Sequence, residues 1–229
     1  MIHTGGPFQG QDYRVPRACI TAGCHYIDLA DDRRFVCDIS QLDAEARAAG
    51  VLLVSGASSV PGLSSCVIAH YADQFSRLDD IDFAIAPGNQ AERGEATVRG
   101  ILSYTGHPIR VWQAATGSRC YGWMSLGACT STPPSAIAHW PVDIPDLELL
   151  PAAYPAVRSV RFQAGLELGL LHYGMWLIAG IARIGLVRDW SRWSKPIVRA
   201  ANGSSAGVPI PAACRSTCAG WTISNSRCT

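Results

Sequence analysis

Hydrophobic and polar positions follow a strand, turn and helix rhythm over residues 1–75. Each repeat opens with a short, almost wholly apolar run and continues into a segment whose apolar residues recur every three or four positions. The predicted strands are 1–3, 25–30 and 51–54, and the predicted helices are 12–24, 35–49 and 63–75. Short apolar strands that alternate with helices are typical of a parallel sheet, in which ligands bind beyond the carboxyl ends of the strands.

The pattern changes after Asp79. Residues 81–85 and 157–162 alternate between apolar and polar positions, which indicates strands with one solvated face. A helix is expected over about 93–104 and another strand over 109–112, so this part favours an α+β domain with an antiparallel or mixed sheet.

The predicted fold class is therefore α/β, with a partial Rossmann-type parallel sheet followed by an α+β second domain. Residues 114–140 and 206–229 are rich in Ser, Thr, Gly and Pro and lack sustained periodicity, which predicts loop or disorder. The expected domains are 1–78, 79–200 and an irregular tail over 201–229.

Composition narrows the class of protein. Hydrophobic residues make up 48% and charged residues 16% of the 229, which is ample material for a core. A net charge of +1 without runs of like charge predicts no nucleic-acid partner. The 9 cysteines are odd in number, and no basic segment followed by an apolar run opens the chain. Reduced thiols and a cytoplasmic location are expected.

A second apolar stretch runs from 168 to 182, interrupted only by His172. It is shorter than the roughly 20 residues that a spanning helix needs. A buried or interface helix is one interpretation. The other is weak membrane association through 166–193, with Trp176, Trp190 and Trp193 at the membrane surface.

Several motifs occur in the order found in one known family. They are His3–Gly10, Ala22–Asp31, Val54–Pro61, Leu147–Pro151 and Arg161–Glu167. Together they resemble the saccharopine dehydrogenase-like, NAD(P)-binding oxidoreductases, over roughly 1–113 and 141–195. The resemblance implies a Rossmann domain, a substrate or dimerisation domain, a homodimer, and hydride transfer between a small-molecule substrate and NAD or NADP.

The sequence also departs from this family. The G-x-G-x-x-G fingerprint is absent, as is the charged residue about 20 positions later that selects NAD or NADP. Residues 117–140 and those after 202 no longer resemble the family. A truncated gene with shifted reading frames would explain these departures. The chain is then expected to be an incomplete oxidoreductase, or a non-catalytic remnant that is either unstable alone or serves only as an interaction module.

The resemblance assigns cofactor binding to residues at or beyond the carboxyl ends of the predicted strands: Thr4, Gly5, Gly6, Pro7, Phe8, Asp28, Ser55 and Gly56. Glycine there would allow close backbone approach or an unusual φ. An ordinary strand-to-helix turn is the alternative for residues 4–8. The sequence names no catalytic residue.

Other polar groups near the strand ends have two interpretations each. Asp28, Asp31 and Asp32 could share a proton in acid–base chemistry or cap the following helix. Ser58 or Ser59 could contact a ligand or cap a helix. Cys214, Cys218 and Cys228 lack a second ligand pair at zinc spacing, so no metal is predicted.

Overall fold

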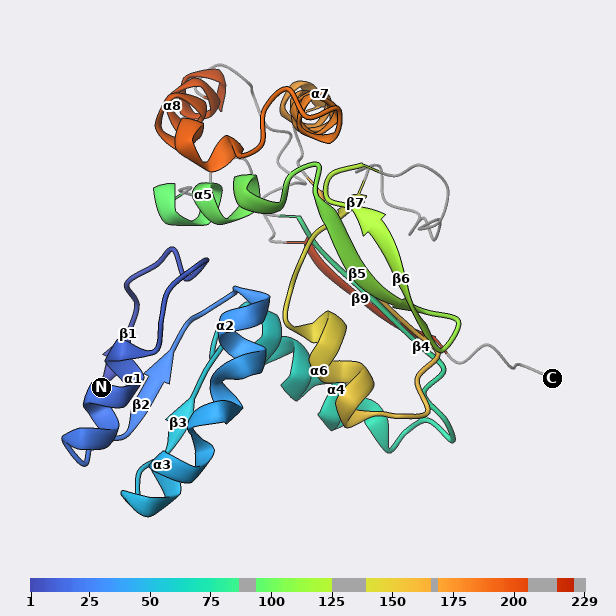
Figure 1. Cartoon of the computed structure of the whole chain (residues 1–229). Coiled ribbons are helices and arrows are strands. Elements are labelled where there is room, and N and C mark those ends of the chain that lie inside the picture. The colour runs from blue at the N-terminus through green and yellow to red at the C-terminus, as the bar shows by residue number, and fades with distance from the viewer. Residues whose placement is uncertain (87–93, 125–138, 166–168, 206–217, 225–229) are drawn as a thin grey trace. The chain divides into compact units, whose positions relative to one another are not determined.

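A computed structural model describes residues 1–86, 94–124, 139–165, 169–205 and 218–224 (Figure 1). The chain divides into two compact units. The first unit comprises residues 1–77 and 144–155, and the second unit comprises 78–143 and 156–229. Residues 144–155, which the sequence prediction places in the second domain, therefore cluster with the first unit.

The first unit is built on a parallel sheet of order β1-β2-β3, with β1 at Ile2–His3, β2 at Tyr26–Asp28 and β3 at Leu53–Val54. Ile2 pairs with Ile27, and Ile27 pairs with Val54. The helical elements are α1 (Arg14–Thr21), α2 (Arg33–Asp38), η1 (Ile39–Leu42), α3 (Asp43–Ala48), η2 (Ser59–Leu63), α4 (Ser64–Ala72) and α6 (Asp146–Ala153). The predicted parallel α/β arrangement is confirmed.

Local sequence signals explain where these helices begin and end. The Asp32 carboxylate accepts a hydrogen bond from the Phe35 N–H at 2.7 Å, so Asp32 caps α2, as one interpretation of the sequence held. Gly23 and Gly50 follow α1 and α3 with φ of 62° and 67°, a conformation that glycine adopts without strain.

The core of the first unit gathers Phe8, Ala30, Phe35 and Val36. The Phe8 and Phe35 rings lie 5.3 Å apart. The helix predicted at 63–75 carries an apolar stripe that includes Leu63 and Tyr71, yet both are exposed, and α4 buries Ser64 and Ile68 instead. Helical spacing alone did not identify the buried face.

The second unit is built on a mixed sheet of order β6-β5-β8-β4-β9, with β7 paired to β8. Its strands are β4 (Asp80–Ala86), β5 (Pro108–Gln113), β6 (Thr116–Tyr121), β7 (His139–Pro141), β8 (Ser159–Gly165) and β9 (Cys218–Ser224). The helical elements are α5 (Glu95–Tyr104), α7 (Gly169–Arg183), η3 (Trp190–Trp193) and α8 (Ser194–Ser205). The strands β4 and β8 are parallel, whereas β4 and β9 are antiparallel, which confirms the predicted mixed sheet.

Two predictions of irregular structure are wrong in part. Within 114–140, β6 forms a hairpin with β5, and β7 pairs with β8. Within 201–229, β9 pairs with β4 along its whole length. These strands carry little apolar alternation, and their conformation depends on the ladder to a neighbouring strand. Residues 125–138, 206–217 and 225–229 lie outside the described residues.

The apolar stretch predicted near 168–182 forms α7, which has 15 residues. Across the described ranges, no helix has both the length and the apolar character needed to cross a bilayer.

Candidate functional site

The carboxyl ends of the three parallel strands of the first unit lie at one edge of their sheet. We call residues 4–8, 28–31 and 55–58, which form this edge, the strand edge. All eight residues with a predicted cofactor role belong to it. Thr4, Gly5 and Gly6 are exposed, Pro7 and Ser55 are half-buried, and Phe8, Asp28 and Gly56 are buried.

Asp28 is the structural centre of the strand edge. Its side chain is fully buried, and its Oδ1 accepts hydrogen bonds from the N–H groups of Ala30 at 2.9 Å and Gly56 at 2.8 Å. The Ser55 hydroxyl donates to Oδ2 at 2.8 Å. Both carboxylate oxygens are therefore engaged within the chain, and Asp28 ties the end of β2 to the loop after β3.

Packing within the chain requires glycine at position 56. Gly56 has a φ of +77°, and an added Cβ would lie 2.8 Å from the Pro61 ring and 3.3 Å from Val36 Cγ1. A side chain would strain the backbone and overlap its neighbours. Position 56 therefore requires glycine because of the fold of the loop after β3.

The loop after β1 is held by a side chain that the sequence analysis did not single out. The Gln11 amide nitrogen donates to the carbonyls of Gly5 at 2.7 Å and Pro7 at 2.8 Å. Neither Gly5 nor Gly6 has a positive φ, so the expected unusual φ is not found there. The Phe8 ring lies in the core, which leaves Thr4–Gly6 as the exposed part of this loop.

Several backbone donors of the strand edge are already satisfied. The N–H groups of Gly6 and Ser58 donate to Thr4 and Gly56 carbonyls at 3.0 and 2.7 Å, and the Ala57 N–H donates to the Asp28 carbonyl at 2.8 Å. A phosphate-binding loop requires N–H groups that point at the anion. These donors, together with the Gly56 N–H, do not form an open anion cradle.

His3 on β1 contacts Tyr26 on β2. Its Nδ1 lies 2.9 Å from the Tyr26 hydroxyl, and Phe8 packs against the imidazole ring with centroids 5.2 Å apart. Burial, and then the neighbouring Asp28 carboxylate, raise the pKa of Tyr26 above its ordinary value. Tyr26 therefore stays protonated and acts as a hydrogen-bonding partner for His3.

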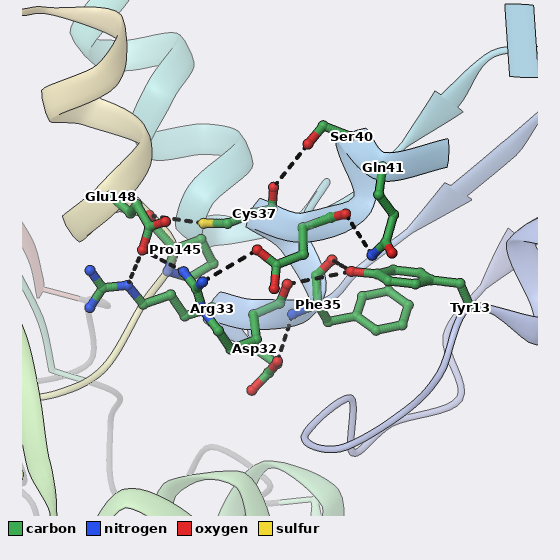
Figure 2. Close-up of polar contacts among 11 residues, drawn as sticks. Tyr13, Asp32, Arg33, Phe35, Cys37, Ser40, Gln41, Pro145 and Glu148 are labelled. Atoms are coloured by element: carbon green, nitrogen blue, oxygen red, sulfur yellow. Dashed lines mark hydrogen bonds and ion pairs between the residues drawn. The ribbon is translucent and has the colours of Figure 1, made fainter. Parts of the chain in front are cut away.

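An ionic cluster joins α6 to α2 within the first unit (Figure 2). Glu148 Oε2 lies 3.1 Å from the Arg33 guanidinium, whose side chain is only 10% exposed, and Glu148 also pairs with Arg34. Burial alone would raise the pKa of Glu148, but the two arginines more than offset this effect and lower it. The Leu147–Pro151 motif thus holds residues 144–155 on the first unit.

A second contact of α6 is buried and incompletely paired. The Ser64 hydroxyl donates to Asp146 Oδ1 at 2.6 Å, and both side chains are fully buried. Asp146 Oδ2 has no hydrogen-bond partner in the described part of the chain. Burial raises the pKa of Asp146 to about 6.

Cys37 lies beside the ionic cluster, and its thiol contacts the Pro145 carbonyl at 3.9 Å. Burial, followed by the Glu148 charge, raises the pKa of this thiol to about 11. We expect Cys37 to react at least about tenfold more slowly than the exposed Cys24 and Cys66 with a thiol reagent at pH 8, because the thiolate is the reactive form. Mass spectrometry of peptides after timed alkylation measures this difference, and equal labelling of all three would contradict it.

Two further predictions concern aspartate and metal chemistry. Asp31 is exposed and accepts a hydrogen bond from the Gln9 amide at 3.3 Å. No three His, Cys, Asp or Glu side chains of the described ranges gather as metal ligands. The side chains of Cys214, Cys218 and Cys228 lie outside the described residues.

Comparison with known proteins finds a likeness among solved structures. No protein-family profile matches the chain, and no curated protein matches it. The structure is similar to apo histidine-tagged saccharopine dehydrogenase (L-Glu forming) from Saccharomyces cerevisiae, at 12% identity and a TM-score of 0.47. The match covers 66% of this chain and 37% of that chain, so the chain spans little more than a third of that enzyme's length. At this level the likeness carries no argument about family or activity.

Proposed function

We propose that the strand edge of the first unit binds a nicotinamide dinucleotide, NAD or NADP, as part of an incomplete hydride-transferring oxidoreductase. The observation that supports this most is the common edge of three parallel strand ends, with Thr4, Gly5 and Gly6 exposed on it. Open parallel sheets bind nucleotides at this edge. The motif resemblance over residues 3–61 points to the same class of ligand.

Under this proposal the residues of the strand edge divide into two groups. Thr4, Gly5 and Gly6 are accessible and would contact the ribose and nicotinamide. Phe8, Asp28 and Gly56 are buried and would support the shape of the edge without touching the ligand. A bound nicotinamide would supply hydride transfer, and the chain would hold it in place. No side chain is assigned as a catalytic acid or base.

The engaged N–H groups favour a second candidate function. Because Gly6, Gly56, Ala57 and Ser58 donate within the chain, most pyrophosphate contacts of a dinucleotide fold would be missing. A chain that lacks these contacts would bind no dinucleotide and would serve as a non-catalytic interaction module. The two candidates differ in whether a dinucleotide binds at all.

A titration of the full chain with NADH or NADPH separates the two candidate functions. Binding is followed by the fluorescence of the reduced nicotinamide. All 7 tryptophans lie outside the first unit, so tryptophan quenching is the less direct signal. We expect saturable binding with a Kd on the order of 1 mM, which corresponds to about −4 kcal/mol.

A pair of variants locates the binding. Gly5→Leu adds bulk on the strand edge, where an added Cβ would lie 3.3 Å from the His3 side chain. Ala49→Leu adds similar bulk at an exposed position before β3, at the opposite end of the strand. We expect Gly5→Leu to weaken binding by about tenfold or more and Ala49→Leu to leave it within about twofold. An absence of saturable binding would favour the interaction module.

A further inference from the structure

Helix α7 of the second unit carries apolar side chains on two opposite faces. Ala179 and Ala182 are buried, whereas Tyr173, Trp176 and Leu177 are 70%, 44% and 58% exposed. A helix of an ordinary globular domain shows one apolar face and one polar face. The exposed apolar face of α7 is therefore not covered by the described part of the chain.

The inner face of α7 is packed tightly. Gly106 follows α5, and a Cβ added to it would lie 2.4 Å from the Ala179 carbonyl oxygen and 2.8 Å from the Ala182 side chain. This close backbone approach fixes which side of α7 faces the rest of the second unit. The exposed apolar face cannot exchange with it.

The exposed residues form one continuous stripe. Positions 173, 176, 177 and 184 fall on the same side of a helix with 3.6 residues per turn. Ile184 extends the stripe beyond the end of α7, because its N–H donates to the Gly180 carbonyl at 3.1 Å, and its side chain is 71% exposed. We call Tyr173, Trp176, Leu177 and Ile184 the apolar stripe.

The chain that follows the apolar stripe adds exposed apolar side chains. Leu186 is 74% exposed and Trp193 is 56% exposed. The Trp190 indole N–H donates to the Ile178 carbonyl at 2.9 Å and so attaches η3 to α7. The apolar stripe is thus followed in the chain by two further exposed apolar side chains, and η3 is attached to α7 through Trp190.

Charge distinguishes this region from the rest of the chain. The whole chain balances 19 basic against 18 acidic residues. Residues 183–199 contain one acidic residue, Asp189, and five exposed basic residues: Arg183, Arg188, Arg192, Lys195 and Arg199. The Asp189 carboxylate is engaged by the Ser191 N–H at 2.8 Å. The exposed chain that follows the apolar stripe therefore carries an excess of positive charge, although the Arg183 guanidinium also lies over the Tyr121 ring.

We propose that the apolar stripe binds an anionic lipid surface. Its aromatic and aliphatic side chains would enter the headgroup and acyl boundary, and the basic residues would contact lipid phosphates and carboxylates. Tryptophan and tyrosine beside lysine and arginine are typical of helices that lie in a membrane interface. A second copy of the chain fits less well, because a two-fold interface would bring the same basic residues face to face.

Vesicle flotation of the full chain tests the proposal, with vesicles of phosphatidylcholine alone and of phosphatidylcholine and phosphatidylserine in equal parts. The wild-type chain is expected to float with the anionic vesicles, and less so as salt is raised, since exposed charges are screened. Trp176→Ser with Leu177→Ser is expected to weaken this binding by about tenfold or more, because two exposed apolar side chains are lost. Equal binding of this double variant and the wild-type chain would overturn the proposal.

A matched control removes equally exposed apolar side chains elsewhere. Leu52 and Leu63 are 61% and 55% exposed in the first unit. The double variant Leu52→Ser with Leu63→Ser is expected to bind anionic vesicles within about twofold of the wild-type chain. A loss equal to that of the stripe variant would overturn the assignment to the apolar stripe.

A charge variant keeps the apolar stripe intact. Arg192→Gln with Lys195→Gln is expected to weaken binding to the anionic vesicles by about 25-fold, since each basic residue near such a surface contributes about fivefold. Binding to phosphatidylcholine alone should not change. Sedimentation of the lipid-free chain tests the alternative of a dimer. A wild-type dimer that becomes a monomer in the stripe variant would show that a second copy covers the apolar stripe, and this would overturn the proposal.

Discussion

Replacing Asp28 with alanine is expected to lower the free energy of unfolding of the first unit by about 4 kcal/mol, because buried donors left without acceptors each cost about 1–3 kcal/mol. The variant leaves the N–H groups of Ala30 and Gly56 and the Ser55 hydroxyl without their acceptor. Hydrogen exchange followed by mass spectrometry over residues 1–77 measures the loss in the first unit alone.

Two variants give this prediction its controls. Asp28→Asn keeps one oxygen acceptor and is expected to cost less, about 1–2 kcal/mol. Asp31→Ala removes an exposed carboxylate three residues after Asp28 and is expected to cost under about 0.5 kcal/mol. If Asp28→Ala were no worse than Asp31→Ala, Asp28 would not hold β2 to the loop after β3.

Asp146 is expected to make the stability of the first unit depend on pH. Its pKa rises from an ordinary 3.8 to about 6 in the folded chain because its side chain is buried. The unfolded chain then loses the proton at lower pH than the folded chain does. The favourable contribution of the protonated form is complete below pH 3.8 and is lost as the pH rises through about 6.

The comparison with Asp146→Asn isolates this contribution, since an amide does not titrate. At each pH, the free energy of unfolding of the variant is compared with that of the wild type. Between pH 3.5 and pH 7.5 the wild type should lose about 3 kcal/mol relative to the variant. Urea unfolding followed by circular dichroism at each pH measures it. Gln41→Ala, at an exposed side chain that does not titrate, should run parallel to wild type. Parallel curves for Asp146→Asn would contradict the assignment.

The apolar runs of the sequence were sufficient to predict the parallel sheet. The runs at 1–3, 25–30 and 51–54 predicted three short strands, and β1, β2 and β3 formed there, although Ile2 and Leu52 are 70% and 61% exposed. The alternation over 81–85 likewise gave β4. In both cases the signal lies in the segment itself, which is why it could be seen without a structure.

The elements that escaped prediction depend on partners distant in sequence or on unusual turns. The hairpin of β5 and β6 turns at Ala114 and Ala115, which have φ of 51° and 60°. Asparagine and glycine are the usual residues of such turns, so no turn signal marks the hairpin. The two residues of the Arg33–Glu148 pair are 115 positions apart, and no local sequence pattern predicts their contact.

The structure places the predicted cofactor residues at the carboxyl ends of the parallel strands and leaves their role untested. The eight residues assigned to cofactor binding do lie on the strand edge, because the ends of β1 and β3 were located correctly and the end of β2 to within two residues. The structural roles of Asp28 and Gly56 could not be predicted from the sequence. They depend on contacts with Ser55 and Pro61 that form only in the folded loop. Their role in cofactor binding stays a prediction.

Binding of a nicotinamide dinucleotide at the strand edge can be tested residue by residue, from the change in backbone amide resonances of the isotope-labelled chain as NADH is added. We expect saturable shifts centred on Thr4, Gly5 and Gly6, with smaller changes at Ser55 and Ser58. Resonances of these five residues that stay unmoved while NADH reaches saturation elsewhere, or that never move, would contradict it.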